Sequence, residues 1–288
     1  MYVVLGATGR TGGAAAAALR ERGKQVRAVV RDAGEVDSMR ERGYDPVIAD
    51  VHDRAALARA FRGAEGVYLF IPPNTGVADF LGDVEETAET LAAAVAEAAP
   101  RHVVALSSTG AQHPAGTGMY VMSNRIERAL RGTSVPRTFL RPAEYTDNWG
   151  AYAHLAREHG VLPSFHQPLD HPFPQVSTRD VGQEAARLLL DPAEGERIVH
   201  LEGPARYTPE DVARTYTELM GRPVQPMTPP RESWVPTLVQ TGMSESYASA
   251  LAALYDASNE GGAGFEPGVG EMRRGTETLR TVLTRHLP

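Results

Sequence analysis

The segment Gly6-Ala7-Thr8-Gly9-Arg10-Thr11-Gly12 has the residue types and spacing of a phosphate-binding loop. It follows a short apolar run and precedes an alanine-rich stretch, so the expected order is strand, loop and helix. Glycines let backbone N–H groups at a helix N-terminus approach a pyrophosphate, because no side chain intervenes. A simple tight turn is the alternative. The motif predicts a dinucleotide site whose contacts include Gly6, Thr8, Gly9, Arg10, Thr11 and Gly12.

The end of the second expected strand, residues 26–30, indicates which dinucleotide binds. An acidic residue there accepts a hydrogen bond from the ribose of NAD, whereas an arginine accommodates the 2′-phosphate of NADP. Arg31 and then Asp32 occupy this place, and Arg10 is a second guanidinium within reach of the same phosphate. We expect NADP as the cofactor, with NAD less favoured. For both arginines the alternative is an ordinary solvated surface charge.

Further cofactor contacts are expected where other strands end. Parallel strands bring their carboxyl ends to one edge of a sheet, which is where ligands bind. Residues 50–51 follow the third strand and are expected at the adenine, whereas residues 70–73 are expected beside the ribose and nicotinamide. The expected contacts outside the glycine loop are Arg31, Asp50, Val51, Phe70, Ile71, Pro72, Pro73, Ser107, Ser108, Asn124 and Pro142.

Side chains suited to a second substrate follow the fifth and sixth expected strands. Ser107 and Ser108 end the fifth strand and can orient an acceptor. Aromatic rings after the sixth strand suit a flat molecule above the nicotinamide, although core packing with a bonded polar tip is the alternative. The expected catalytic residues are Tyr145, Ser107 and Asn124, and the expected substrate contacts are Tyr145, Asn148, Trp149 and Tyr152.

The composition excludes several other chemistries. The chain has no cysteine, which excludes disulfides, zinc knuckles and iron–sulfur clusters. Its single lysine, Lys24, precedes Gln25 and cannot end a P-loop, which needs serine or threonine there. The run Ser107-Ser108-Thr109-Gly110 lacks the G-x-S-x-G elbow of a serine hydrolase. No metal is expected, because ligand spacing is absent from His154, His159, His166 and His171.

The charge balance limits the partners. The 288-residue chain has 29 basic and 36 acidic residues and a formal net charge of −7. Nucleic acid or an anionic membrane demands a basic face, so neither is expected as a partner. No run approaches the roughly 18 apolar residues of a spanning helix, and the N-terminus leads directly into a strand, so no spanning or secretory segment is expected. These observations favour a cytoplasmic protein.

A parallel sheet is needed to position these side chains. Strands are expected at residues 2–5, 26–30, 47–49, 67–71, 103–106 and 138–140, and helices at 14–22, at 77–98 and around 126–130; a short strand at 198–201 and a helix at 243–258 are expected after Pro142, in the smaller lobe. Capping boxes at 177–180 and 208–211 start two more helices. The helix at 77–98 should bury one face formed by Val77, Phe80, Leu81, Val84, Ala88, Leu91 and Val95. Apolar strands alternating with helices indicate an α/β protein with a Rossmann-type, doubly wound parallel sheet.

The pattern of elements changes after Pro142, and prolines and histidines crowd residues 166–174. We therefore expect a dinucleotide-binding domain at residues 1–142 and a smaller mixed substrate lobe at residues 143–288. The boundary is approximate, because the lobe interleaves with the sheet.

The glycine loop, Arg31 and Ile71-Pro72-Pro73 together resemble the NmrA-like branch of the atypical (extended) short-chain dehydrogenases. The segments 124–130, 138–142, 145–148, 177–181 and 274–276 extend this resemblance over essentially the whole chain. The resemblance implies a Rossmann fold and NADP as the cofactor. Proteins of this branch include NAD(P)H:quinone oxidoreductases, triphenylmethane reductases and NADP-binding regulators without demonstrated turnover.

One position departs from the catalytic pattern of short-chain dehydrogenases. These enzymes use a Tyr-x-x-x-Lys pair, in which the lysine lowers the pKa of the tyrosine so that it can transfer a proton. The matching positions here are Tyr120 and Asn124, and Lys24 lies far away along the chain. The ordinary tyrosine–lysine machinery therefore cannot operate.

Two functions agree with these residues. The first is an NADPH-dependent reductase that passes hydride to a quinone-like or other conjugated planar acceptor; water can protonate the resulting delocalised anion, so Asn124 is compatible. A ketoreductase or isomerase is not separated from it by these residues. The second is a non-catalytic NADP(H)-binding redox sensor that acts through a protein partner. Either is expected as a monomer or homodimer.

Overall fold

The computed structural model describes residues 1–262 and 264–287, and in them eight strands form one sheet. The spatial order is β13-β10-β6-β5-β4-β1-β2-β3, and every neighbouring pair is parallel. The strands are β1 (Tyr2–Leu5), β2 (Val26–Val30), β3 (Asp45–Ile48), β4 (Gly66–Leu69), β5 (Val103–Leu106), β6 (Arg137–Pro142), β10 (Glu196–Glu202) and β13 (Glu271–Arg274). The doubly wound parallel sheet predicted from the sequence is confirmed.

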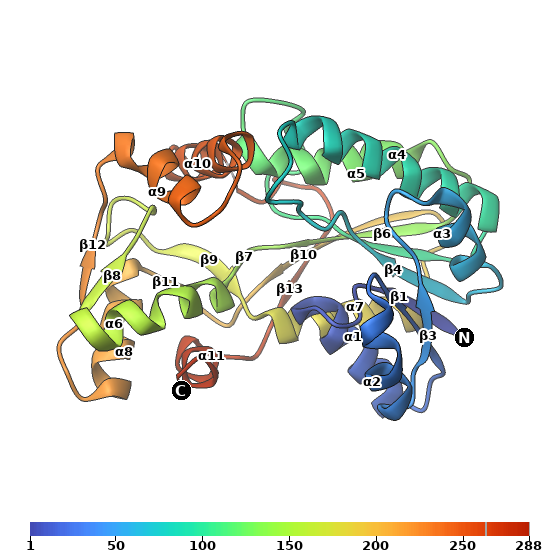
Figure 1. The fold of residues 1–288 in the computed structure, drawn as a ribbon, viewed down its shortest axis with the longest axis horizontal. Helices are drawn as coiled ribbons and strands as arrows, with labels where there is room; N and C mark the ends of the chain where they lie inside the picture. The colour runs from blue at the N-terminus through green and yellow to red at the C-terminus, as the bar shows by residue number, and fades with distance from the viewer. Residues whose placement is uncertain (263, 288) are drawn as a thin grey trace.

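Helices cover both faces of this sheet (Figure 1). One face carries α3 (Arg54–Phe61), α4 (Phe80–Ala98) and α5 (Val121–Arg131), and the other carries α1 (Arg10–Glu21), α2 (Val36–Glu41) and α7 (Thr178–Leu190). Because strand side chains alternate between the faces, Val3 packs into one apolar core and its neighbour Val4 into the other. Both faces of the central strands are buried, which explains their nearly continuous apolar sequences.

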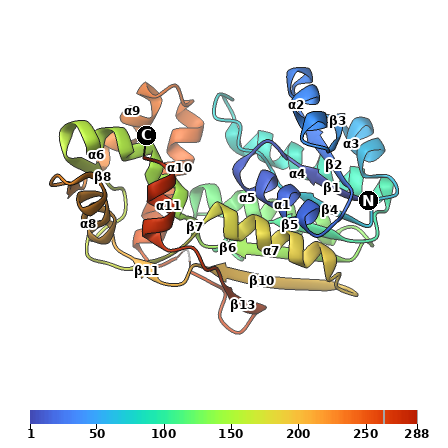
Figure 2. The same ribbon diagram turned by 90° about the horizontal axis from the view of Figure 1, so that it is seen from below.

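A smaller lobe is built from two short sheets and the remaining helices (Figure 2). The strands β7 (Glu144–Tyr145), β9 (Phe173–Val176) and β11 (Arg206–Tyr207) form a mixed sheet, and β8 (Val161–Pro163) pairs with β12 (Gln225–Met227). The helices are α6 (Ala153–His159), α8 (Pro209–Met220), α9 (Trp234–Gln240), α10 (Glu245–Asn259) and α11 (Leu279–Arg285). Within the described residues, none of the helices has the length and apolar character needed to cross a membrane.

The C-terminal half of the chain returns to the main sheet. The strand expected around 198–201 as part of the lobe is β10, which pairs with β6, and β13 then pairs with β10. Helix α7 covers the same face as α1 and lies beside it (Figure 2). These pairings satisfy the backbone of β6, which would otherwise be an exposed sheet edge. Residues after 142 thus contribute both to the main sheet and to the lobe. We propose residue 142 only as the start of the substrate-binding part of the chain.

Helix α4 differs from its predicted form at its first turn. It begins at Phe80 rather than at residue 77, because the Asp79 carboxylate caps it by accepting a hydrogen bond from the Gly82 N–H. Leu81 was predicted on the buried face but is 48% exposed. The cap sets the rotation of the helix so that Phe80 faces the core, and the next residue turns toward solvent.

The other helix starts follow the predicted caps more closely. Ser177 accepts a hydrogen bond from the Asp180 N–H at the start of α7. Thr208 and Asp211 form a reciprocal capping box at the start of α8. Helix α1 begins at Arg10, earlier than the predicted residue 14, so the last residues of the glycine loop form its first turn.

Gly182 allows α7 to pack directly against α1, the helix that follows the glycine loop. A Cβ atom at Gly182 would lie 2.4 Å from the Ala14 Cβ and 2.7 Å from the Thr11 carbonyl oxygen. Gly182→Ala should force the helices apart and lower the free energy of unfolding by about 1–3 kcal/mol. Denaturant titration measures this loss. Gly195→Ala is the control, because a Cβ there meets nothing within 4 Å; equal losses in both variants would contradict the close-packing explanation.

Candidate functional site

The loop between β1 and α1 is compact because its glycines allow close contacts. Gly6 has a left-handed backbone (φ +63°), and a Cβ at Gly12 would lie 2.3 Å from the Gly6 carbonyl oxygen. Gly9 precedes α1 without a side-chain cap, and no acidic residue lies in the first turn. The N–H groups of that turn are therefore available to an anion, and the absence of a side chain at Gly9 keeps the approach open. The loop fits the pyrophosphate of a dinucleotide.

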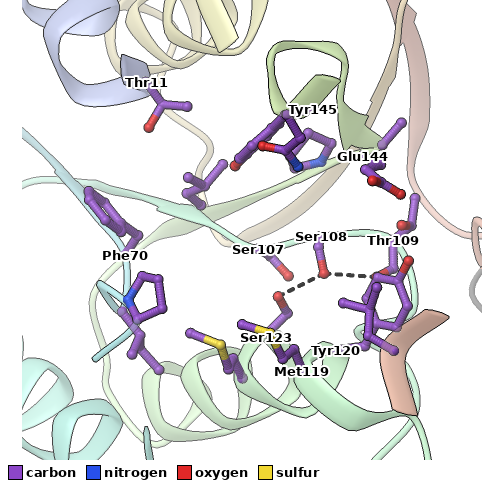
Figure 3. Close-up of a pocket in the computed structure, with 18 of the residues that line it drawn as sticks. Thr11, Phe70, Ser107, Ser108, Thr109, Met119, Tyr120, Ser123, Glu144 and Tyr145 are labelled. Atoms are coloured by element: carbon purple, nitrogen blue, oxygen red, sulfur yellow. Dashed lines mark hydrogen bonds between the residues drawn. The ribbon is translucent and has the colours of Figure 1, made fainter. Parts of the chain in front are cut away.

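A cavity of ≈ 460 Å³ adjoins this loop at the carboxyl edge of the sheet. The strand order reverses between β1 and β4, and open α/β sheets bind ligands outside such a reversal. Thr11 and Phe70 lie at one end of the close-up, whereas Thr109, Tyr120 and Glu144 lie at the other (Figure 3). The expected site residues that line the cavity are Gly9, Arg10, Thr11, Phe70, Ile71, Pro73, Ser107, Ser108, Pro142, Tyr145 and Asn148.

Sequence reasoning missed one wall of this cavity. Helix α10 supplies Tyr247, Leu251, Leu254 and Tyr255, and the segment around η2 (Gly118–Tyr120) and the start of α5 supplies Met119, Tyr120, Met122 and Ser123. The α10 residues recur at helical spacing. This spacing indicates a buried helix face, but it does not indicate that the face lines a cavity. Glu144 also lines the cavity, and its position beside Tyr145 was the only hint in the sequence.

Several expected cofactor residues lie outside the cavity lining. Gly6 and Gly12 shape the loop, Thr8 is exposed, and Pro72 is half-buried. Arg31 is exposed after β2, and Asp50 and Val51 follow β3. Because β2 and β3 continue the sheet beyond β1, these residues extend the same carboxyl edge.

Arg10 and Arg31 have different surroundings, although both were expected at one phosphate. The Arg10 guanidinium donates a hydrogen bond to the Asn148 Oδ1 at 3.3 Å, so it points toward the lobe. Arg31 lies on the exposed end of β2 instead. Arg10 thus lies between the glycine loop and the lobe, and both arginines stay predicted contacts of a 2′-phosphate.

Three other expected site residues are not brought to the main cavity. The Asn124 amide donates to the Ala111 carbonyl oxygen at 2.9 Å and thereby holds the loop after β5. Trp149 is buried, and its indole N–H donates to the Gln175 Oε1 at 2.9 Å. Trp149 and Tyr152 lie in η3 (Thr146–Tyr152) and line an adjoining cavity of ≈ 450 Å³ in the lobe. Packing of η3 into the lobe core directs these rings away from the sheet edge.

A buried ion pair holds Ser107 in place below the cavity. The Arg141 Nε and Nη2 donate to the two Glu127 carboxylate oxygens, each at 2.7 Å, and the exposed fractions of these side chains are 2% and 0%. Arg141 also donates to Glu266 at 2.6 Å. The Ser107 hydroxyl donates to Glu127 at 2.6 Å. Because its proton is used in this way, Ser107 presents only oxygen lone pairs to a ligand.

Ser108 is also bonded within the site. Its hydroxyl donates to the Thr109 carbonyl oxygen at 2.8 Å and lies 2.9 Å from the Ser123 hydroxyl (Figure 3). These bonds join the end of β5 to α5. In the described residues, no group of three His, Asp or Glu side chains is placed to hold a metal ion.

The tyrosines of the cavity are not activated for proton transfer. Burial raises the pKa of Tyr145, and the neighbouring Arg10 only partly opposes this effect. Burial and then the Glu144 carboxylate raise the pKa of Tyr120. Both phenols therefore stay protonated at neutral pH and serve as hydrogen-bond donors rather than as acids.

The ion pair gives a test of what supports the site. Glu127→Gln would leave the buried Arg141 charge with Glu266 alone, so the free energy of unfolding should fall by about 3–5 kcal/mol. Chemical denaturation measures this change. Asp37→Asn removes the exposed partner of Arg40 and should change it by no more than about 0.5 kcal/mol. A comparably small effect of Glu127→Gln would show that the buried pair does not support the fold.

Comparisons with known proteins agree with this geometry. The model of the NmrA-like family matches residues 2–276. A (4-alkanoyl-5-oxo-2,5-dihydrofuran-3-yl)methyl phosphate reductase from Streptomyces griseus is 31% identical over 226 residues, which cover 78% of this chain and 76% of that protein.

Two solved structures share the fold. One is an Escherichia coli NADPH-dependent quinone oxidoreductase complexed with NADPH (TM-score 0.81, 23% identity, 99% of each chain). The other is a Citrobacter sp. triphenylmethane reductase complexed with NADP(H) (TM-score 0.81, 22% identity, 100% of each chain). The matched length and the shared fold lead to one conclusion: the chain belongs to the NmrA-like family.

Proposed function

We propose that this protein is an NADPH-dependent reductase that transfers hydride to a quinone-like or other conjugated planar acceptor. The observation that carries the proposal is the open cavity beside the glycine loop at the carboxyl edge of the sheet. The names of the similar proteins support it: one is a reductase of a dihydrofuranone, one a quinone oxidoreductase and one a triphenylmethane reductase.

The glycine loop and its neighbours have the chemistry to hold the cofactor, and NADPH supplies a hydride when it is bound. The N–H groups at the start of α1 face the pyrophosphate position, and Arg31 is a candidate for the 2′-phosphate. Phe70, Ile71 and Pro73 line the adjacent wall and give it an apolar surface.

The rest of the cavity is suited to a conjugated acceptor with a large apolar surface. Its opposite wall on α10 is made of aromatic and aliphatic side chains, among them Tyr247 and Leu254. The Tyr145 hydroxyl is a hydrogen-bond donor for an acceptor oxygen. The contribution of the protein is then mainly to hold acceptor and cofactor in a fixed, dry arrangement.

The cavity also bears on the alternative of a redox sensor. A sensor needs a cofactor site and a partner surface, but it does not need room for a second small molecule beside the cofactor loop. The volume of ≈ 460 Å³ lies in the range of small-molecule sites. The cofactor takes part of this volume, and the adjoining lobe cavity of ≈ 450 Å³ adds room for a second molecule, which supports the reductase over the sensor.

Turnover is tested by mixing NADPH-loaded protein with a panel of quinones and following NADPH absorbance in a single turnover. We expect oxidation above the enzyme-free rate with at least one quinone. Leu254→Trp should slow it by filling the cavity while NADPH still binds, whereas Ser249→Trp places a ring of the same size on an exposed position of α10 and should not. No oxidation by any quinone would refute the proposal.

The choice of cofactor is tested at Arg31. Arg31→Ala should weaken NADPH binding by about 10–100-fold, because charge-assisted hydrogen bonds contribute about 1.5–3 kcal/mol. NADH binding should not change, since NADH has no 2′-phosphate. Calorimetry measures both affinities, and Arg214→Ala, on exposed α8, is the control. If both cofactors weaken equally, Arg31 does not read the 2′-phosphate.

A further inference from the structure

Glu144 and His166 form a buried pair at the end of the cavity away from the glycine loop (Figure 3 shows Glu144). The Glu144 Oε2 and the His166 Nε2 lie 2.8 Å apart, and the exposed fractions of the two side chains are 18% and 6%. Neither atom makes an in-line hydrogen bond to any described residue. The two atoms are therefore in contact and bonded to no other described group, and because Glu144 also lines the main cavity, its carboxyl group can exchange a proton with a ligand there.

The position of the pair connects three cavities. Glu144 lines the main cavity, the lobe cavity and a third cavity of ≈ 220 Å³. His166 lines the lobe cavity and the third cavity but not the main cavity. Glu144 therefore offers a direct route by which a proton taken up by His166 from the lobe cavity or the third cavity reaches the main cavity.

The surrounding elements hold both side chains in fixed orientations. Glu144 belongs to β7 and pairs with Gln175 of β9. The His166 ring stacks on Phe173 with centroids 3.8 Å apart, and Tyr255 meets it edge-on at 5.0 Å. The Ser164 hydroxyl accepts a hydrogen bond from the His166 backbone N–H at 3.1 Å.

Three titratable groups near Glu144 are tyrosines; in addition, His171 and Arg206 line the third cavity, and Arg10, Asp147 and His286 line the lobe cavity. Tyr120 comes from η2, Tyr152 from η3 and Tyr255 from α10. Burial raises the pKa of each of them, and the Glu144 charge adds to this effect. These phenols hold their protons tightly and are therefore not the proton donors of the step proposed below.

Reduction of a neutral acceptor creates a need for such a pair. Hydride transfer leaves the acceptor as an anion, and an unprotonated anion among apolar walls costs several kcal/mol of lost solvation. Arg10, a cation that lines the cavity, lies at the glycine-loop end. Protonation inside the cavity removes this cost.

We propose that Glu144 donates the proton that completes reduction of the acceptor, with His166 as the relay that restores it. This inference rests on the proposed reductase function. The hydride brings an electron pair to the acceptor. The proton held by the Glu144–His166 pair then passes through the Glu144 carboxyl group: a transient Glu144 O–H bond breaks, and its proton joins the acceptor anion. Glu144 regains a proton from the His166 Nε2, and His166 regains one from water. Overall, acceptor, NADPH and one proton give reduced acceptor and NADP⁺.

Two acceptors of different charge test this step. A neutral quinone needs a proton after hydride transfer, whereas a cationic triphenylmethane dye becomes neutral by taking the hydride alone. In single turnovers at saturating acceptor, Glu144→Gln should slow complete reduction of the quinone by about 10²-fold or more and leave reduction of the dye unchanged.

Further variants separate proton transfer from packing. His166→Phe keeps a ring against Phe173 but removes the imidazole, so it should slow the quinone alone. The double variant should be no slower than Glu144→Gln, because the two groups act in series. Glu184→Gln removes a partly buried carboxylate of α7 that lines none of these cavities and should slow neither acceptor.

A readout without turnover uses the cofactor-free protein. The ring ¹⁵N signals of His166 should move in Glu144→Gln and not in Glu184→Gln. Unmoved signals, equal slowing of both acceptors or slowing of neither would overturn the proton relay. If the wild-type protein oxidises NADPH with neither the quinone nor the dye, the reductase function itself is refuted. This result is obtained before any variant is made, so the two failures are distinguishable.

Discussion

The buried ion pair between Arg141 and Glu127 connects the elements that surround the site. It joins β6 to α5, and the same carboxylate accepts the Ser107 hydroxyl at the end of β5. The third guanidinium nitrogen reaches Glu266, in the segment that leads to β13. Two charges taken out of water are tolerated only when their hydrogen-bonding groups are satisfied. Because this requirement is met in one arrangement, the pair determines where the ends of β5 and β6 lie.

Above these strand ends, the cavity has two chemically different ends. The uncapped N-terminus of α1 and Arg10 offer N–H groups and positive charge at one end. Glu144 and His166 form an acid–base pair at the other. Apolar side chains of α10 lie between them. In the proposed reaction, the groups at the first end would hold the cofactor, which supplies the hydride, and the pair at the second end supplies the proton. This division offers a way for the fold to complete a reduction without the tyrosine–lysine pair.

Local sequence patterns predicted the elements that local interactions determine. The strands at residues 2–5, 26–30 and 103–106 begin and end as predicted, because both of their faces are apolar. The cap residues Ser177 and Thr208 were visible, because a hydroxyl three residues before an acid is a local signal. The strand β13 was missed, since Glu271–Arg274 is polar and is held by backbone bonds to β10 and by ion pairs of Arg273 and Arg274 with distant residues.

The sequence by itself determined the fold class, the glycine loop and the lack of a lysine at position 124. Each of these depends on residue type at neighbouring positions. Only the tertiary structure decided which side chains share a cavity. Asn124 and Trp149 bond to Ala111 and Gln175 instead of facing the main cavity. Glu144 and His166 meet because β7 and the segment before β9 are held side by side. Such contacts between distant residues follow from packing, which no local periodicity encodes.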